Sequence, residues 1–147
     1  QFGIFIAFYV FYYFQGAAIS LNGLVVFFPL LIIVMGILGL GLGMFISSLV
    51  TKYRDFSHLI GFGVQLLMYV SAVVYPMALV KEKMPEYAWL VQYNPLAYII
   101  ETTRYMLLNV GHISFWGLGY TFVATVLIFL VGVLIFNRTE KSFIDTV

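Results

Sequence analysis

Glu101 and Arg104 are the two ionisable residues whose spacing in the sequence points most directly to a function. They lie three positions apart in the apolar stretch 96–108, and side chains at positions i and i+3 of a helix are neighbours that can form an ion pair. An ionisable pair inside a membrane indicates a functional site. A salt bridge near the outer water interface is an equally good interpretation, because a helix that dips shallowly need not bury the pair.

Two breaks that contain proline, Tyr75-Pro76 and Asn94-Pro95, precede this pair. Proline removes a helical hydrogen bond and clashes with the preceding turn, and in a membrane the freed carbonyl must be satisfied by protein or water. The first break is also compatible with an ordinary end of a membrane span. Together the breaks predict a bent, partly polar element between longer helices.

Aromatic side chains make up 19% of the chain, with 11 Tyr and 15 Phe. Aromatic rings can stack on the C–H faces of sugars, and tyrosine adds a hydroxyl. Such residues suit the lining of a path for glycans, but they suit contact with lipid equally well.

No catalytic or metal site assembles from the sequence. It contains no P-loop, HExxH or GxSxG motif, no cysteine and two histidines. The net charge of +1 gives no electrostatic basis for binding nucleic acid. We therefore expect no catalytic residue, no metal ligand and no enzyme activity in this chain. The carboxylates are scattered: Asp55, Glu82, Glu86, Glu101, Glu140 and Asp145.

The elements that must position these residues are membrane helices. Hydrophobic residues make up 63% of the chain and charged residues 9%, whereas soluble domains carry about 25% charged residues. With so few charges the surface would be mostly apolar, which water does not tolerate on that scale. We predict an all-α membrane protein with about four transmembrane helices.

The apolar runs differ in length, and length decides which of them can cross a bilayer. The run 24–50 reaches about 40 Å at roughly 1.5 Å per residue, enough for a hydrocarbon core of roughly 30 Å, whereas the stretch 96–108 reaches only about 20 Å. We predict one domain with a re-entrant hairpin at about 80–110 and a tail at 137–147. The predicted spans are 1–14, 24–50, 58–79 and 115–136.

A polar turn, Lys52-Tyr53-Arg54-Asp55, separates the second and third spans. Lysine and arginine near span ends favour the cytoplasm. Placing this turn and the basic tail inside gives a small excess of positive charge there, which favours a cytoplasmic C-terminus.

Gly39 and Gly43 form a GxxxG pair on the second span. Such pairs let another helix backbone come close, so we predict tight helix packing at this face.

Four segments follow one another in an order that resembles a known family. They are KYRDFSHLI, QLLMYVSAVVYPMALV, YNPLAYIIETTRYMLL and FNRTEKSFIDTV. In this order they resemble the permease subunits of type-2 ATP-binding-cassette exporters, in the branch that exports O-antigen and related surface polysaccharides. The resemblance covers essentially the whole chain, although Ala72 stands where the family often has proline.

The resemblance implies a subunit with six spans that works as a dimer in the inner membrane of a bacterium. ATP and Mg²⁺ would be held by a partner ATPase, with no cofactor in this chain, and the substrate would be a lipid-linked glycan of the O-antigen, capsule or teichoic-acid type. The chain, which begins at Gln1, would be the C-terminal part, holding spans three to six. The breaks would form the outer gate of the passage, with site residues Tyr69, Tyr75, Pro76, Asn94, Pro95, Tyr98, Glu101 and Arg104.

Two other functions stay open at this stage. One is a type-2 exporter of a small drug or lipid, and the other is an integral-membrane enzyme that acts on lipid-linked sugars. A neighbouring reading frame that encodes an ATPase would favour the polysaccharide exporter. If the Glu101–Arg104 pair holds the hairpin, reversing one charge should impair export and reversing both should partly restore it.

Overall fold

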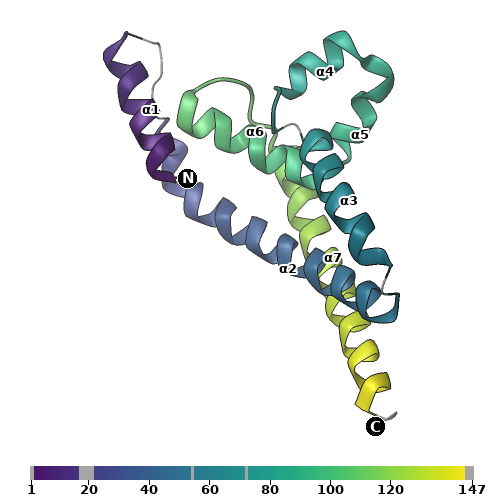
Figure 1. Ribbon diagram of the computed structural model, residues 1–147. Coiled ribbons are helices and arrows are strands. Elements are labelled where there is room, and N and C mark those ends of the chain that lie inside the picture. Colours follow the sequence, from purple (N-terminus) through teal and green to yellow (C-terminus); the bar gives the residue numbers. More distant parts are fainter. Residues whose placement is uncertain (1, 17–21, 54, 72, 145–147) are drawn as a thin grey trace.

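The computed structural model describes residues 2–16, 22–53, 55–71 and 73–144. Within these ranges every regular element is a helix (Figure 1), so the prediction of an all-α fold is confirmed. The elements are α1 Phe2–Phe14, η1 Gly23–Phe27, α2 Phe28–Lys52, α3 Phe56–Val70, α4 Met77–Lys83, η2 Pro85–Tyr87, α5 Ala88–Gln92, α6 Pro95–Leu108 and α7 Phe115–Ile144.

Two segments of the described chain are long and apolar enough to cross a membrane. They are Gly23–Lys52 with 30 residues, which joins η1 to α2, and Phe115–Glu140 with 26 residues in α7. At roughly 1.5 Å per residue each exceeds the ~30 Å of a hydrocarbon core. Most of their apolar side chains are exposed, as expected of helices whose solvent is lipid. Two shorter apolar helices, Gly3–Phe14 and Phe56–Val70, accompany them.

The helices α2 and α7 pack closely through glycine. A Cβ added to Gly41 would lie 2.7 Å from the Phe129 Cα, and one added to Gly132 would overlap the Gly41 carbonyl oxygen. Small residues of this kind let two backbones approach. We predicted this contact at Gly39 and Gly43, but a Cβ at either would meet no atom of the chain within 4 Å. The glycine between them makes the contact.

The helix α3 is shorter than the run 58–79 that we expected to form a span. It ends at Val70, six residues before Pro76, and α4 begins after that proline. Its 15 residues reach about 22 Å at roughly 1.5 Å per residue. The described residues between the two helices, Ser71 and 73–76, therefore form an irregular segment whose backbone polar groups need partners outside a helix.

The helix α7 continues to Ile144, beyond the predicted span end at residue 136. In the polar turn, Lys52 ends α2 and Asp55 precedes α3. Arg54 of that turn and Asp145 of the predicted tail lie outside the described residues.

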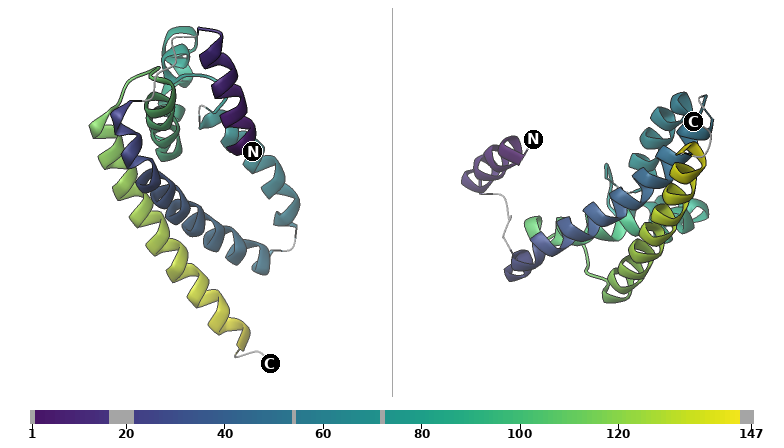
Figure 2. Two further views of the ribbon diagram at one scale, coloured as in Figure 1. Left: turned by 90° about the vertical axis from the view of Figure 1, so that its left-hand side faces the viewer. Right: turned by 90° about the horizontal axis from the view of Figure 1, so that it is seen from below.

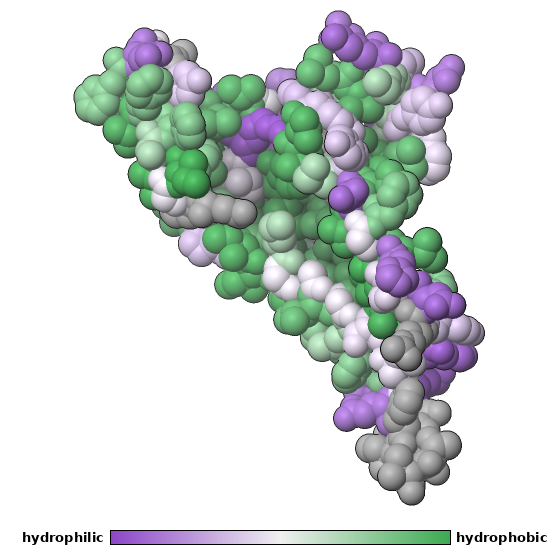
Figure 3. Space-filling model, viewed as in Figure 1, coloured by the Kyte–Doolittle hydropathy of each residue, from purple (hydrophilic) through white to green (hydrophobic). Residues whose placement is uncertain are grey.

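The short helices α4, α5 and α6 gather at one end of the molecule, whereas the α2–α3 turn and the C-terminal end of α7 lie at the other (Figure 1). Figure 2 shows α1 standing apart from the other helices. Hydrophilic side chains collect over α4 and, at the opposite end, near the α2–α3 turn, with a mostly hydrophobic surface between them (Figure 3). This pattern suits a bilayer whose two surfaces lie at those two ends.

The helix α6 is anchored in the angle between α2 and α7. Its Ile99 and Met106 are buried against Leu31 of α2, with Leu118 of α7 packed on the same cluster. This packing fixes which face of α6 is left to point at the irregular segment.

Candidate functional site

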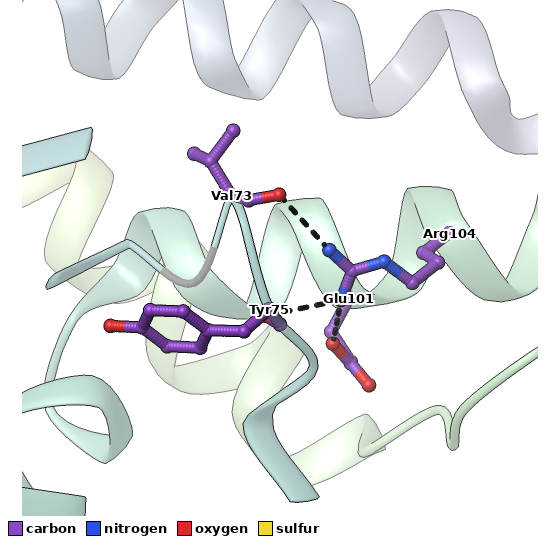
Figure 4. Close-up of polar contacts among 4 residues, drawn as sticks. All are labelled: Val73, Tyr75, Glu101 and Arg104. Carbon is purple, nitrogen blue, oxygen red and sulfur yellow. Dashed lines mark hydrogen bonds and ion pairs between the residues drawn. The ribbon is translucent and has the colours of Figure 1, made fainter. Parts of the chain in front are cut away.

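Arg104 of α6 holds the irregular segment that follows α3. Its guanidinium donates from Nη2 to the Val73 carbonyl at 3.2 Å and from Nη1 to the Tyr75 carbonyl at 3.5 Å. The same Nη1 pairs with Glu101 Oε2 at 2.8 Å. Figure 4 shows the guanidinium pointing from α6 to the segment, while the Tyr75 ring points away from it. We call these four residues the polar latch.

The latch answers a backbone requirement set by the break. Val73 and Tyr75 lie outside α3 and α4, so their carbonyls accept no helical hydrogen bond. Arginine presents several N–H donors in a fixed planar fork, and hydrogen bonds from a charged donor are about twice as strong as neutral ones. The polar latch therefore supplies the Val73 and Tyr75 carbonyls with hydrogen-bond donors that water would otherwise have to supply.

Glu101 is the counter-ion of the latch and is the more buried of the pair. The side chains of Glu101 and Arg104 are 10% and 17% exposed. A Cβ added to Gly111 would lie 2.8 Å from Glu101 Oε1, and Gly111 has a φ of +102°. Only glycine adopts this backbone easily, so the loop after α6 can close over the carboxylate.

Asn94 makes a second polar connection between α6 and the end of α3. Its Nδ2 donates to the buried Ser71 Oγ at 3.0 Å, and its Oδ1 accepts from the Leu96 backbone N–H at 3.0 Å. Asn94 is thus the N-cap of α6, and Pro95 takes the first helical position, where its missing N–H costs nothing. One side chain both starts α6 and fixes it to the break.

We expect Asn94→Ala to destabilise the protein by about 2 kcal/mol, because it removes an N-cap worth about 1 kcal/mol and a buried hydrogen bond worth about 1 kcal/mol. Ser71→Ala should cost about 1 kcal/mol. In a double-mutant cycle followed by thermal unfolding in detergent, the two changes should couple by about 1 kcal/mol. Strictly additive effects would contradict the Asn94–Ser71 contact.

Tyr98 packs on α7 and not on the latch. A Cβ added to Gly117 would overlap the Tyr98 ring, and the ring meets Tyr120 edge-on at 6.3 Å. The Tyr120 hydroxyl in turn donates to the Tyr93 carbonyl at 2.8 Å, and Thr121 donates to the Pro95 carbonyl at 3.2 Å. The start of α6 is therefore fixed to α7, while its middle is fixed to the break.

Gly117→Ala should destabilise the α6–α7 contact by about 1–3 kcal/mol, the usual cost of overpacking, because the new methyl group occupies the space of the Tyr98 ring. Tyr98→Ala is destabilising by itself, but the loss in the double variant should be less than the sum of the losses in the two single variants, because Tyr98→Ala vacates the space that the new methyl group needs. Thermal unfolding of the two single variants and the double variant tests this. If the loss of stability in the double variant equals the sum of the losses in the two single variants, the Tyr98 ring does not rest on Gly117.

The predicted gate residues fall into separate contacts of the described structure. Tyr75 donates its hydroxyl to the Tyr69 carbonyl, so these two tyrosines lie together at the end of α3, where the Tyr69 side chain is exposed. Pro76 is the N-cap of α4. Glu101 and Arg104 pair as the i, i+3 spacing predicts.

The polar turn between α2 and α3 forms a small aromatic and basic cluster. Lys52 Nζ lies 5.5 Å from the centre of the Tyr53 ring, within the range of a cation–π contact. The Tyr53 and Phe56 rings lie 5.9 Å apart. This turn lies at the end of the molecule opposite α4 and α5 (Figure 1).

Several residues of these contacts were not among the predicted ones: Ser71, Val73, Tyr93, Gly111, Gly117, Tyr120 and Thr121. Ser71 and Gly117 show no pattern in the sequence that marks them as partners of Asn94 and Tyr98. Gly111 carries a local signal, since it follows Asn109, which ends α6 with a φ of 55°. Asparagine and glycine after a helical run are typical helix C-cap residues.

The arrangement holds the irregular segment through hydrogen bonds from a charged side chain. Within the described residues no three His, Cys, Asp or Glu side chains come close enough to hold a metal ion. The guanidinium of the ion pair donates to two carbonyl groups of the same chain.

Three comparisons with known proteins bear on this geometry. Residues 1–108 match the model of the family described as "ABC-2 type transporter". Two proteins of Klebsiella pneumoniae, each named O-antigen export system permease protein RfbA, are 26% and 27% identical to the chain over 117 residues. That alignment covers 80% of this chain and 44% of each relative, so the chain spans less than half the length of the curated relatives it matches. No solved structure gives a significant match.

Proposed function

This chain belongs to the ABC-2 type transporter family, and from that premise we propose that it is the membrane-spanning subunit of an ATP-driven exporter of lipid-linked polysaccharide. The substrate would be of the O-antigen, capsule or teichoic-acid type. The names of the two Klebsiella relatives support this class of substrate. The tyrosine-rich helices support it as well, because tyrosine can stack on a sugar and also donate a hydrogen bond.

The observation that carries the proposal is the irregular segment held by the polar latch. Non-helical backbone at membrane depth is tolerated only where protein buries it or where it lines a wet cavity. Here α3 and α6 are both shorter than a bilayer, and the segment between α3 and α4 is satisfied by Arg104. We propose that α4, α5 and α6 form a re-entrant hairpin at the outer face and act as a gate.

Within this gate, the exposed Tyr69 side chain would face the substrate passage, and Tyr75 would hold the end of α3 beside it through its hydroxyl. Tyr98 would support the gate from the side of α7 and would not face the passage, because its ring packs against that helix. Pro76 and Asn94-Pro95 would keep the two bends of the hairpin in place.

The exporter would need partners outside this chain. We propose a separate ABC ATPase subunit that holds ATP and Mg²⁺, a second copy of the permease, and membrane lipid around both. The polar turn with Lys52 and Asp55 and the C-terminus would face the cytoplasm of the bacterium, in its inner membrane. The chain itself would carry no enzyme activity.

The test is complementation in a bacterium that lacks its own O-antigen permease. The full-length subunit, expressed with its ATPase, should restore the glycan at the cell surface, detected by antibody on intact cells. A catalytically dead ATPase is the matched control and should leave the glycan inside. Unchanged surface glycan with both proteins present and folded would refute the proposal.

The same strains separate the two alternative functions. A drug or lipid exporter would change resistance to small toxic compounds without moving glycan to the surface. An enzyme acting on lipid-linked sugars would change the structure of the intracellular glycan in the absence of the ATPase. The engagement of Arg104 with backbone carbonyls and of Glu101 with Arg104 gives no support to the second of these.

A further inference from the structure

A small apolar pocket lies on the side of the irregular segment that faces away from Arg104. It has a volume of about 270 Å³, is open on one side, and is lined by the end of α3, by α4, by η2 and by α5. Its walls include Tyr75, Leu79, Tyr87, Leu90 and Val91. This volume is slightly below the range of about 300–1,000 Å³ that is typical of small-molecule sites, so it suits part of one hydrocarbon chain.

The chemistry of the lining restricts what can bind there. The lining is almost entirely hydrocarbon, and Lys83 is the charged residue among the described residues that form it. A sugar would need several hydrogen-bonding groups, which this lining does not offer. An apolar slot with a single cation at its edge suits an amphiphile that has a hydrocarbon tail and an anionic head.

The position of the pocket agrees with such a ligand. The last turn of α4 carries Lys81 and Lys83, and Figure 3 shows hydrophilic residues over α4 next to a hydrophobic surface. Tyr87 is 58% exposed at the same edge, as is usual for a tyrosine at a membrane interface. A membrane phospholipid has its phosphate at this boundary and its chains just below it.

We propose that this pocket binds one acyl chain of an anionic phospholipid of the surrounding membrane, with the lipid phosphate against Lys83. The bound lipid would be a resident component of the hairpin and not the exported substrate. Its binding does not depend on what the protein transports.

The pocket and the polar latch share one residue. The Tyr75 side chain lines the pocket, while the Tyr75 carbonyl accepts from Arg104. A chain in the pocket would therefore press on the segment that the latch holds. The lipid and the polar latch would then contact the irregular segment at Tyr75 from opposite sides.

The experiment is native mass spectrometry of the full-length subunit purified in detergent with equal amounts of dioleoyl-phosphatidylglycerol and dioleoyl-phosphatidylcholine. We expect one phosphatidylglycerol molecule to be retained in preference. Lys83→Gln should reduce this retention about fivefold, since one lysine near an anionic lipid contributes about 1 kcal/mol. Lys81→Gln is the matched control, because it removes the same charge from the same turn outside the pocket, and it should have a smaller effect.

A second pair of variants tests the pocket itself. Leu79→Trp should fill the slot and remove most of the retained lipid, whereas Leu66→Trp, on α3 outside the pocket, should leave it in place. Both positions are exposed, at 40% and 48%, so both variants should fold, and their melting temperatures check this. Equal losses from both lysine variants, retention unaffected by Leu79→Trp, equal retention of the two lipids, or a second copy of the chain or a lipid-linked saccharide in place of phospholipid would each overturn the proposal.

Discussion

Arg104→Ala is expected to abolish surface export and to lower the stability of the full-length subunit. The change removes donors from the Val73 and Tyr75 carbonyls and leaves Glu101, whose side chain is 10% exposed, without its cation. Removing one partner of a buried ion pair costs about 3–5 kcal/mol, and we expect the lower end of that range because the pair is not fully enclosed. Thermal unfolding in detergent and antibody labelling of surface glycan measure the two effects.

Glu101→Ala is the matched control for this prediction. It removes the carboxylate but leaves the guanidinium on the two carbonyls, and Arg104 is 17% exposed, so water can help to solvate the charge. We therefore expect a clearly smaller loss than for Arg104→Ala. Arg104→Lys should fall between them, because lysine keeps the charge but lacks the planar fork. Equal losses from Arg104→Ala and Glu101→Ala would show that the ion pair alone matters.

The combined charge reversal, Glu101→Arg with Arg104→Glu, separates the two explanations most sharply. From the sequence, where only the ion pair is visible, we expected partial recovery. In the structure, a glutamate at position 104 would place a carboxylate, which only accepts hydrogen bonds, against two carbonyl acceptors. We now expect the double reversal to export no better than Arg104→Glu alone. Recovery would mean that the carbonyl contacts are dispensable.

Gly132→Val should separate α2 from α7, and this is the second large effect we expect. A Cβ at Gly132 would overlap the Gly41 carbonyl oxygen, and the clash is with backbone, which cannot turn aside as a side chain can. Overpacking of this kind costs about 1–3 kcal/mol and occasionally more. Because α6 is anchored on both helices, the latch should loosen as well. Thermal unfolding and surface export should both fall.

Gly119→Val on the same helix is the control for Gly132→Val. A Cβ at Gly119 would meet nothing within 4 Å, and the change alters helix propensity by the same amount. It should leave stability within about 0.5 kcal/mol of the parent, as surface substitutions usually do. If the two variants lose the same stability, a general effect of valine in α7 and not the α2–α7 contact explains the result.

The broad class of this protein was readable from its sequence. With 63% hydrophobic and 9% charged residues, the chain has too few polar groups to cover a soluble surface, and helices are the way for such a chain to satisfy its backbone in lipid. The run at Phe115 and the run after Gly23 exceed the thickness of a bilayer, so their lengths alone mark them as candidate spans. The i, i+3 spacing of Glu101 and Arg104 likewise predicted their ion pair.

What these residues do was decided by tertiary structure. Sequence spacing relates Arg104 to Glu101 because both lie on one helix, but Val73 and Tyr75 are about thirty positions away, and only the packing of α6 between α2 and α7 brings the guanidinium to their carbonyls. Likewise, the α2–α7 contact lies at Gly41 and not at Gly39 and Gly43, because the position where the two helices cross determines which glycine of α2 faces α7. Periodicity shows which residues share a face of a helix, whereas the neighbour that this face meets depends on how the whole chain packs.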